Sequence, residues 1–249
     1  MYERTTDAGM VATGCASTAS GVLEAVIYGD PSKRAAMLLR LTSQLVASAN
    51  ALTGARTIPA LPHTGPYTLD EALVGLPAPN RGALKAVIAT SLGRITCTLD
   101  ERRAPIAVAN FVGLARGIRP FQDPKDGWVT RRYYDGLTFH RVIPGFVIQG
   151  GDLAGNGSGG VGYTIKNEDK NGLVFDHPGR LATARGGDPD SAGGQFFITD
   201  APAPHLDHNQ TIFGDCGPIS TIHAIASVPH GPDDKPRTPV EIDSVTISR

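Results

Sequence analysis

A cationic side chain stands among apolar residues in the segment FHRVIPGFVIQGGD, residues 139–152. Arg141 lies in the first of two strand-like runs and Gln149 in the second, and Pro144-Gly145 separates the runs. A guanidinium among apolar strand residues is costly unless it is paired or faces an open site. Arg141 is therefore a candidate for chemistry that needs a fixed positive charge. The alternative is an arginine on the solvent face of a half-buried strand.

A second cluster, GGQFFIT over residues 193–199, follows a loop rich in Gly, Asp, Pro and Ser. Successive strand side chains point to opposite faces, so Gln195 and Phe197 share one face and Phe196 takes the other. An amide beside an aromatic ring suits a bound peptide, because the amide can hold a backbone group while the ring packs on a side chain. The alternative is that both phenylalanines belong to the core.

A third cluster, PHLDHNQTIFG over residues 204–214, contains two histidines. His205 and His208 are three residues apart in a predicted turn, with no cysteine or third histidine close by. Catalytic zinc usually needs three protein ligands, so we expect neither a metal nor another cofactor here.

Together the three segments resemble the cyclophilin family of peptidyl-prolyl cis–trans isomerases. The resemblance covers roughly residues 82–249, about two-thirds of the chain, and the motifs occur in the family's order and spacing. It implies a mostly β fold, with a closed eight-stranded antiparallel barrel capped by two helices. It also implies rotation about Xaa-Pro peptide bonds in proline-containing peptides and unfolded proteins, which assists protein folding.

The family's site residues carry over one position at a time. Arg141 matches the catalytic arginine, with Gln149 and Phe146 beside it in the catalytic set. Phe146, Phe197 and Leu206 match the pocket for the proline ring, and Val147 stands where a methionine is usual. The substrate-binding positions implied by the resemblance are Val147, Ala184, Arg185, Gln195, Phe197, His205, Leu206 and Gln210.

Three of these positions depart from the usual pattern. Arg185 stands where an asparagine is usual, His205 where many members have tryptophan, and Gln210 where a histidine often lines the rim. The loop that follows Arg185 also looks one residue longer. In the family the tryptophan grips cyclosporin through its indole, so we expect weak cyclosporin binding here.

Two other functions stay open at this level. The barrel could be a non-catalytic module that binds proline peptides, an alternative that the changes at Arg185, His205 and Gln210 favour. It could also be a spacer, with residues 1–80 docking a partner. The retained Arg141 and Gln149 favour the enzyme.

Composition excludes some classes of partner. The chain has 249 residues, with 23 Lys plus Arg against 24 Asp plus Glu, a net charge of −1. Because broad nucleic-acid clamps and anionic-membrane binders need excess positive charge, we expect neither partner. No apolar run approaches the roughly 20 residues of a membrane span. We expect a cytoplasmic monomer, or a periplasmic protein if an export signal lies upstream.

The three cysteines, Cys15, Cys97 and Cys216, are too few and too scattered to suggest a disulfide framework. They also lack the Cys-x-x-Cys pairing of a structural zinc site, which disfavours bound zinc.

The elements that must position these residues fall into three predicted parts. Residues 1–55 form a helical N-terminal extension, with a helix from Asp30-Pro31 to Gly54. Residues 56–81 form a Pro-rich linker with one short helix near residues 69–74. Residues 82–249 form the isomerase domain, with helices at 105–117 and 218–227. Its eight predicted strands span 84–90, 94–100, 138–143, 146–149, 180–184, 195–199, 211–213 and 240–248.

An insertion over residues 118–134, IRPFQDPKDGWVTRRYY, looks longer than in compact members of the family. It holds the chain's single tryptophan, Trp128. We expect a packed loop beside the active face, and a partner-binding loop is the alternative.

Overall fold

The computed structural model describes residues 12–18, 21–27, 58–76 and 82–249. The chain divides into two compact units, residues 1–56 and 57–249. In the first, β1 (Ala12–Thr18) and β2 (Gly21–Ile27) pair as an antiparallel hairpin. The extension expected to be helical is therefore β structure where it is described, which suits the β-branched residues of both strands. The helix predicted from Asp30 to Gly54 lies outside the described residues.

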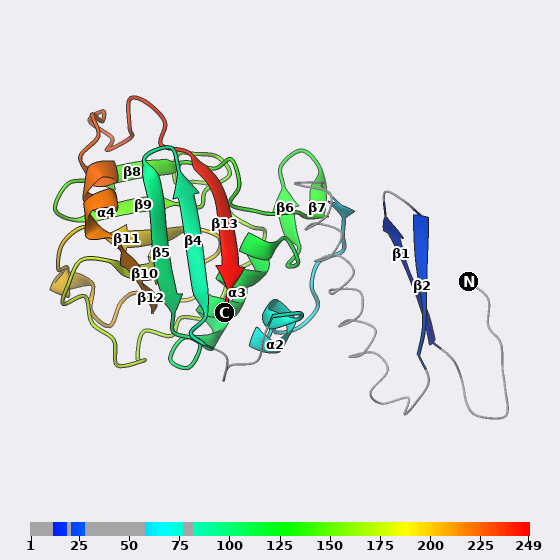
Figure 1. Ribbon diagram of the computed structural model, residues 1–249. Helices are drawn as coiled ribbons and strands as arrows, with labels where there is room; N and C mark the ends of the chain where they lie inside the picture. Colours follow the sequence, from blue (N-terminus) through cyan, green and yellow to red (C-terminus); the bar gives the residue numbers. More distant parts are fainter. Residues whose placement is uncertain (1–11, 19–20, 28–57, 77–81) are drawn as a thin grey trace, which may run out of the picture. The chain divides into compact units, whose positions relative to one another are not determined.

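An eight-stranded antiparallel sheet forms the body of the second unit (Figure 1). All eight predicted strands are confirmed, in the spatial order β13-β4-β5-β12-β10-β11-β9-β8. Their bounds are β4 (Lys85–Thr90), β5 (Gly93–Leu99), β8 (Phe139–Ile143), β9 (Val147–Gly150), β10 (Arg180–Thr183), β11 (Phe196–Thr199), β12 (Ile212–Gly217) and β13 (Ile242–Ser248).

The sheet curls into a barrel that is less closed than expected. Its two edge strands, β8 and β13, share no ladder among the described residues. Instead a single bridge joins Thr138 to Glu241, and the Phe139 amide donates to the Val240 carbonyl at 2.9 Å. The Gly136 amide also donates to the Ile242 carbonyl at 2.8 Å, and the Ile242 amide donates to the Leu137 carbonyl at 2.7 Å, so a short set of bonds between residues 136–139 and 240–242 closes the barrel.

Side chains alternate between the barrel interior and its outer face. Along β4 and β5 every second residue is buried, as a strand period of two requires. The inner residues join one core with the apolar sides of α3 (Pro105–Arg116) and α4 (Ile219–Ala226), the two helices expected. In Figure 1, α4 lies beside the strands at one end of the barrel.

The start of α3 is capped from far along the chain. Pro105 occupies the first turn, and the preceding Ala104 offers no side-chain cap. The carboxylate of Glu168 supplies the acceptor instead, since the amides of Ile106 and Ala107 donate to it at 2.9–3.1 Å. Gly117 ends the helix in the left-handed conformation, with φ 68°.

Residues 58–76, within the expected linker, are part of the second unit. β3 (Ile58–Pro59) pairs with β7 (Gly127–Thr130), and α2 (Leu69–Leu73) packs beside α3. Arg116 of α3 donates to the carbonyls of Ala72 and Val74 at 2.6 and 2.8 Å. The compact unit thus begins at Thr57 rather than at the boundary expected near residue 82, because these contacts tie the segment to α3.

The insertion at 118–134 folds into a hairpin, with β6 (Phe121–Asp123) pairing with β7. Just before it, the buried guanidinium of Arg119 lies 4.6 Å from the ring centre of Tyr67 and 4.0 Å from that of Tyr163. Arg119 also donates to Asn110 at 2.7 Å. Two ring faces and one amide oxygen thus take the place of a carboxylate partner for this cation.

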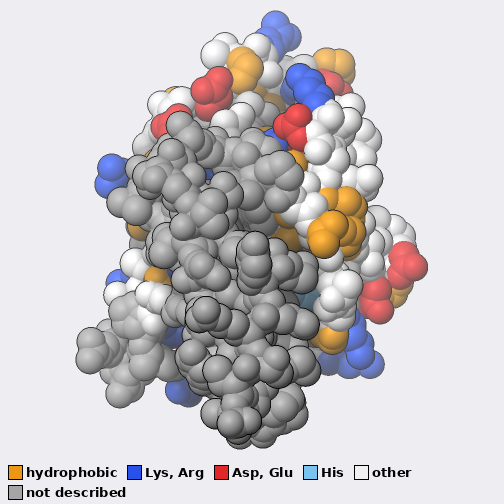
Figure 2. All heavy atoms as spheres, turned by 90° about the vertical axis from the view of Figure 1, so that its right-hand side faces the viewer, with side chains coloured by type: hydrophobic (Ala, Val, Ile, Leu, Met, Phe, Trp, Pro, Cys, Tyr) orange, Lys and Arg blue, Asp and Glu red, His pale blue; other side chains and the backbone are white. Residues whose placement is uncertain are grey.

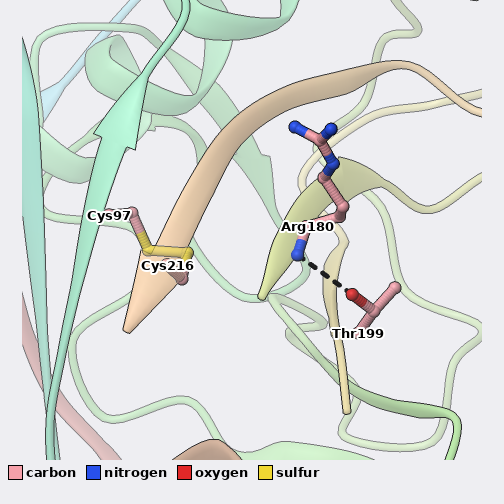
Figure 3. The surroundings of a disulfide bond; sticks show 4 residues. All are labelled: Cys97, Arg180, Thr199 and Cys216. Carbon is pink, nitrogen blue, oxygen red and sulfur yellow. Dashed lines mark hydrogen bonds between the residues drawn. A yellow bond between two sulfur atoms is a disulfide. The ribbon is translucent and has the colours of Figure 1, made fainter. Parts of the chain in front are cut away.

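A disulfide joins Cys97 of β5 to Cys216 of β12, with an S–S distance of 2.04 Å (Figure 3). The two cysteines are 119 residues apart in sequence, yet they face each other directly in the strand register. Nothing in the sequence alone predicts this bond, because the cysteines are too few and too scattered to suggest a disulfide framework. Distance along the chain says nothing about register across a sheet.

Within the described ranges, no helix is long and apolar enough to cross a bilayer. On the face shown in Figure 2, basic and acidic side chains are interspersed, and neither sign forms a continuous patch over the described atoms there. This mixture matches the near-neutral balance of the whole chain.

Reduction of the Cys97–Cys216 bond should lower the free energy of unfolding by about 2–4 kcal/mol, because the bond restricts the unfolded chain across a long loop. Urea unfolding with and without a reductant measures the difference. The double variant Cys97→Ser/Cys216→Ser is the control and should unfold at the same urea concentration in both buffers. An unchanged midpoint for the wild type, with its thiols shown to be free, would contradict the prediction.

Candidate active site

Three adjacent strands place a cation, an amide and an aromatic ring in one row. Arg141 of β8 is the register partner of Gln149 of β9, and Gln149 is also the partner of Phe197 of β11. Directly paired residues project from the same face of a sheet. The opposite face of the same strands carries Ile148 and Phe196, which belong to the barrel core. Arg141, Gln149 and Phe197 therefore lie together on the outside of the barrel.

A second apolar cluster, separate from the core, covers this outer face beside the row. We call it the outer-face cluster. Phe197 and Val147 are almost fully buried in it, and Phe146 and Leu206 pack against it while partly exposed. Leu206 comes from a short 3-10 helix, η2 (Pro204–Leu206). The full cluster is Phe146, Val147, Leu173, Phe175, Ala182, Phe197, Ala203, Ala184, Leu206 and Ile212.

The two glutamines are linked to each other and to a glycine-rich loop, residues 155–162. Gln149 Nε2 donates to Gln195 Oε1 at 3.0 Å. Gln195 Nε2 in turn donates to the carbonyls of Gly157 and Gly159 at 3.0 and 2.9 Å. Because the chain of bonds fixes the amide orientation of Gln195, its oxygen faces Gln149.

Asp152 holds the glycine-rich loop in place. Its buried carboxylate accepts from the amides of Ala154, Asn156 and Gly157 at 2.7–3.2 Å. A Cβ on Gly159 would lie 2.1 Å from Asp152 Oδ1, so only glycine fits there. The loop is therefore shaped around one carboxylate, and its carbonyls hold Gln195.

The turn that carries Phe146 is held by a buried acid. Asp200 follows β11, and its Oδ2 accepts from the Gly145 amide at 2.8 Å. The Asp200 amide donates to the Phe146 carbonyl, also at 2.8 Å. His223 of α4 lies 3.1 Å from the same carboxylate. Gly145 has φ 72°, which a residue with a side chain would adopt only with strain.

The three residues that depart from the usual family pattern are exposed or half-buried. Arg185 donates to the carbonyls of Asn209 and Gly186 at 2.7 and 2.9 Å, so its charge ties two loops together. His205 is exposed, and its ring centre lies 5.2 Å from that of Phe146. Gln210 is half-buried, and its Oε1 has no hydrogen-bond partner within residues 58–76 and 82–249. No described contact of Gln210 joins it to the row of Arg141 and Gln149.

Sequence reasoning missed several residues that complete the site. Phe175 stacks on Phe197 with ring centres 5.7 Å apart, Asp200 holds the Phe146 turn, and Asp234 lies 3.2 Å from Arg141. Phe175 could have been suspected from its place in a short apolar run, LVF at 173–175. Nothing local in the sequence marks the two acids, because their partners are distant in the chain.

The cyclophilin-type peptidyl-prolyl cis-trans isomerase family model matches residues 85–247, which include all of the barrel strands except the last residue of β13. The chain belongs to this family. The Mycobacterium tuberculosis peptidyl-prolyl cis-trans isomerase A is 44% identical over 167 residues, covering 66% of this chain and 91% of that protein. Peptidyl-prolyl cis-trans isomerase B of Streptomyces anulatus is 43% identical, over 66% of this chain and 96% of that protein.

Solved structures agree with this assignment. A cyclophilin-type isomerase of Cryptosporidium parvum is 29% identical, with a TM-score of 0.60, over 68% of this chain and 99% of that one. A second structure of that protein, in the presence of the dipeptide Ala-Pro, has a TM-score of 0.58. This cyclophilin is a peptidyl-prolyl cis–trans isomerase, and its substrates are proline-containing peptides.

One buried histidine lies next to the site without an evident part in catalysis. His140 is 5% exposed, and within residues 58–76 and 82–249 neither ring nitrogen has a hydrogen-bond partner. Burial lowers the pKa of His140 below its usual range, Asp152 opposes this effect, and Lys235 and Arg141 add to it. The folded protein therefore favours the neutral ring.

This histidine should make the cyclophilin less stable in mild acid. An unfolded histidine binds its proton near pH 6.5 and the folded one only at lower pH, so stability falls as pH drops through 6.5. The slope contributed by one group can reach about 1.4 kcal/mol per pH unit. Urea unfolding between pH 7.5 and 5.5 measures it. The variant His140→Asn should show a smaller slope, whereas exposed His208→Asn should keep the wild-type slope; equal slopes in all three proteins would refute the idea.

Proposed function

We propose that isomerisation takes place on the outer face of the barrel, with Arg141 as the catalytic residue and the outer-face cluster as the site for the proline ring. The row formed by Arg141, Gln149 and Phe197 carries this proposal, because it brings a cation and an apolar surface side by side. Binding and twisting an Xaa-Pro amide requires both an apolar surface and a hydrogen-bond donor. Its ring is apolar, and its nitrogen becomes a hydrogen-bond acceptor when the bond twists.

The reaction requires stabilisation of a twisted amide. Conjugation between carbon and nitrogen opposes rotation with a barrier of about 18–20 kcal/mol, and uncatalysed Xaa-Pro exchange takes roughly tens to hundreds of seconds. At the top of the barrier the nitrogen lone pair is no longer shared with the carbonyl. A donor aimed at this nitrogen interacts more strongly with the twisted amide than with either planar form, which is what lowers a barrier.

Arg141 suits this task because its guanidinium is permanently charged and carries several donors in one plane. Its side chain is 40% exposed, so it can reach a bound peptide. No bond to carbon forms or breaks in the reaction, and no proton is transferred. The side chain therefore acts only through its charge and its N–H groups.

The neighbouring residues would hold the substrate still while one side of the amide turns. Buried Phe197 and Val147 offer a fixed apolar floor, and half-buried Phe146 and Leu206 offer walls for a proline ring. Gln149, the strand neighbour of Arg141, keeps one N–H and its amide oxygen for a peptide carbonyl or amide. Both N–H groups of Gln195 are already donated within the protein, so only its oxygen can accept a further bond from a peptide amide. One structure of the Cryptosporidium parvum relative is described as determined in the presence of the dipeptide Ala-Pro, which agrees with a proline peptide as the substrate proposed here.

The disulfide supports an oxidising compartment such as the periplasm over the cytoplasm. Disulfides persist in oxidising surroundings and are rare in proteins kept among cytosolic thiols. Cys97 and Cys216 are both buried, and each lies within a strand of the barrel.

Replacing Arg141 by alanine should lower kcat/KM on an Xaa-Pro peptide by two or more orders of magnitude, on the order of 3 kcal/mol of transition-state stabilisation. A protease-coupled assay or exchange spectroscopy on a proline peptide measures this loss. Arg141→Lys should fall between the wild type and the alanine variant, because an ammonium is a more strongly hydrated point charge. The control Arg102→Ala, at an exposed turn, should retain activity. Near-normal turnover in Arg141→Ala would overturn the proposed mechanism.

Cyclosporin should bind this cyclophilin weakly, because His205 stands at the position of the tryptophan that grips the drug in the family. His205 is exposed, and its ring lies beside that of Phe146, so the larger indole of a tryptophan can be accommodated at this position. Titration calorimetry should show weak binding to the wild type and tighter binding to His205→Trp. The control His208→Trp should bind as the wild type does. A tight complex with the wild type would disprove this prediction.

A further inference from the structure

The guanidinium of Arg141 has one protein partner, and that partner comes from a distant loop. Arg141 Nε donates to Asp234 Oδ2 at 3.2 Å. Within residues 58–76 and 82–249 the two terminal nitrogens of Arg141 have no protein partner. Asp234 therefore engages the base of the guanidinium fork and leaves the two ends available.

The loop that carries Asp234 is built to keep its carboxylate in this place. The Val142 amide, next to Arg141, donates to the Asp234 carbonyl at 2.8 Å. The Gly231 amide donates to the Lys235 carbonyl, also at 2.8 Å, and this bond closes the loop of residues 231–235. Asp234 has φ 61°, a left-handed conformation that Asp and Asn tolerate far better than most residues do.

Lys235, the next residue, ties the same loop to the glycine-rich loop at residues 155–162. Lys235 Nζ donates to the Gly155 carbonyl at 2.9 Å. Gly155 belongs to the glycine-rich loop whose carbonyls at Gly157 and Gly159 hold Gln195. The 231–235 segment thus contacts both the strand of Arg141 and the loop behind Gln195.

We infer that Asp234 is a positioning residue for isomerisation: its carboxylate fixes Arg141 through Nε and turns the two terminal nitrogens toward the proline amide. The inference rests on the proposed role of Arg141. An arginine side chain has many rotamers, so an unrestrained one would spend little time aimed at the substrate nitrogen. A single charge-assisted bond at Nε restricts the plane of the fork without using its ends.

A carboxylate next to a catalytic cation also has an opposing effect. Part of the field of Arg141 is drawn toward Asp234, which weakens its pull on the substrate. Because both side chains are about one-third exposed or more, water screens this loss. Orientation is not screened in the same way, so we expect the positioning effect to exceed the electrostatic loss.

The test is the variant Asp234→Asn in the full-length protein. Asparagine keeps the size of the side chain and accepts the left-handed backbone, so the loop should stay folded. We expect kcat/KM on an Xaa-Pro peptide to fall on the order of tenfold, mainly through kcat. The matched control is Asp233→Asn, which makes the same charge change at the exposed neighbouring residue and should leave kcat/KM within about twofold of wild type.

Two further readouts separate positioning from a merely structural role. The ¹⁵N–¹H resonance of Arg141 Nε should be protected from exchange in the wild type and in Asp233→Asn, and should lose this protection in Asp234→Asn. In an Arg141→Ala background, Asp234→Asn should cause no further loss of the residual activity, since it has no guanidinium left to orient.

Wild-type activity or greater in Asp234→Asn would overturn the inference, and so would an equal loss in the Arg141→Ala background. These failures differ from that of the proposed mechanism, which is overturned when Arg141→Ala itself stays active.

Discussion

Three neighbouring strands of this barrel must satisfy two environments at once. Their inner side chains complete a close-packed core, while their outer side chains place a cation, an amide and an aromatic ring next to one another. The alternation of strand side chains makes both possible, because a residue and its neighbour never share a face. A shift of register by one residue would move Arg141 into the core and Val142 out of it, so the site and the core depend on the same register.

The glutamines and the Phe146 turn on the outer face keep fixed orientations because a chain of hydrogen bonds ties them to buried carboxylates. Gln149 is oriented by Gln195, Gln195 by the glycine-rich loop, and that loop by Asp152. Asp200 does the same for the turn at Phe146. Both acids are buried: Asp152 accepts from three backbone N–H groups, and Asp200 accepts from the Gly145 amide with His223 beside it, which suits carboxylates in a low-dielectric setting. Few of the side chains that would meet the substrate are free to reorient, which is the structural condition for preorganised stabilisation.

Local features of the sequence predicted most of this barrel. Alternation along residues 94–100 and the Pro-Gly break at 144–145 are local signals, and the strands and helices they mark are found in the structure. The hairpin inside 118–134 was not predicted, because its short strands show no clear alternation. The Cys97–Cys216 pair, Phe175 and Asp234 were missed for another reason. Each acquires its meaning from a partner that only the fold brings close.

The segment before the barrel belongs to the compact unit although it lies outside the part that the family model matches. The family model starts at residue 85, yet Tyr67 packs so tightly over α3 that a Cβ on Gly113 would lie 2.6 Å from its hydroxyl. The same ring shields one side of Arg119, and Arg119 holds Asn110, whose amide reaches the carbonyl of Gly193 two residues before Gln195. A chain trimmed to the residues that the family model matches would lack Tyr67, so one face of the Arg119 guanidinium would lose its cover. That guanidinium is linked through Asn110 to Gly193, in the segment that leads to Gln195. The compact unit that carries the barrel, residues 57–249, is thus longer than the part that the family model matches, residues 85–247.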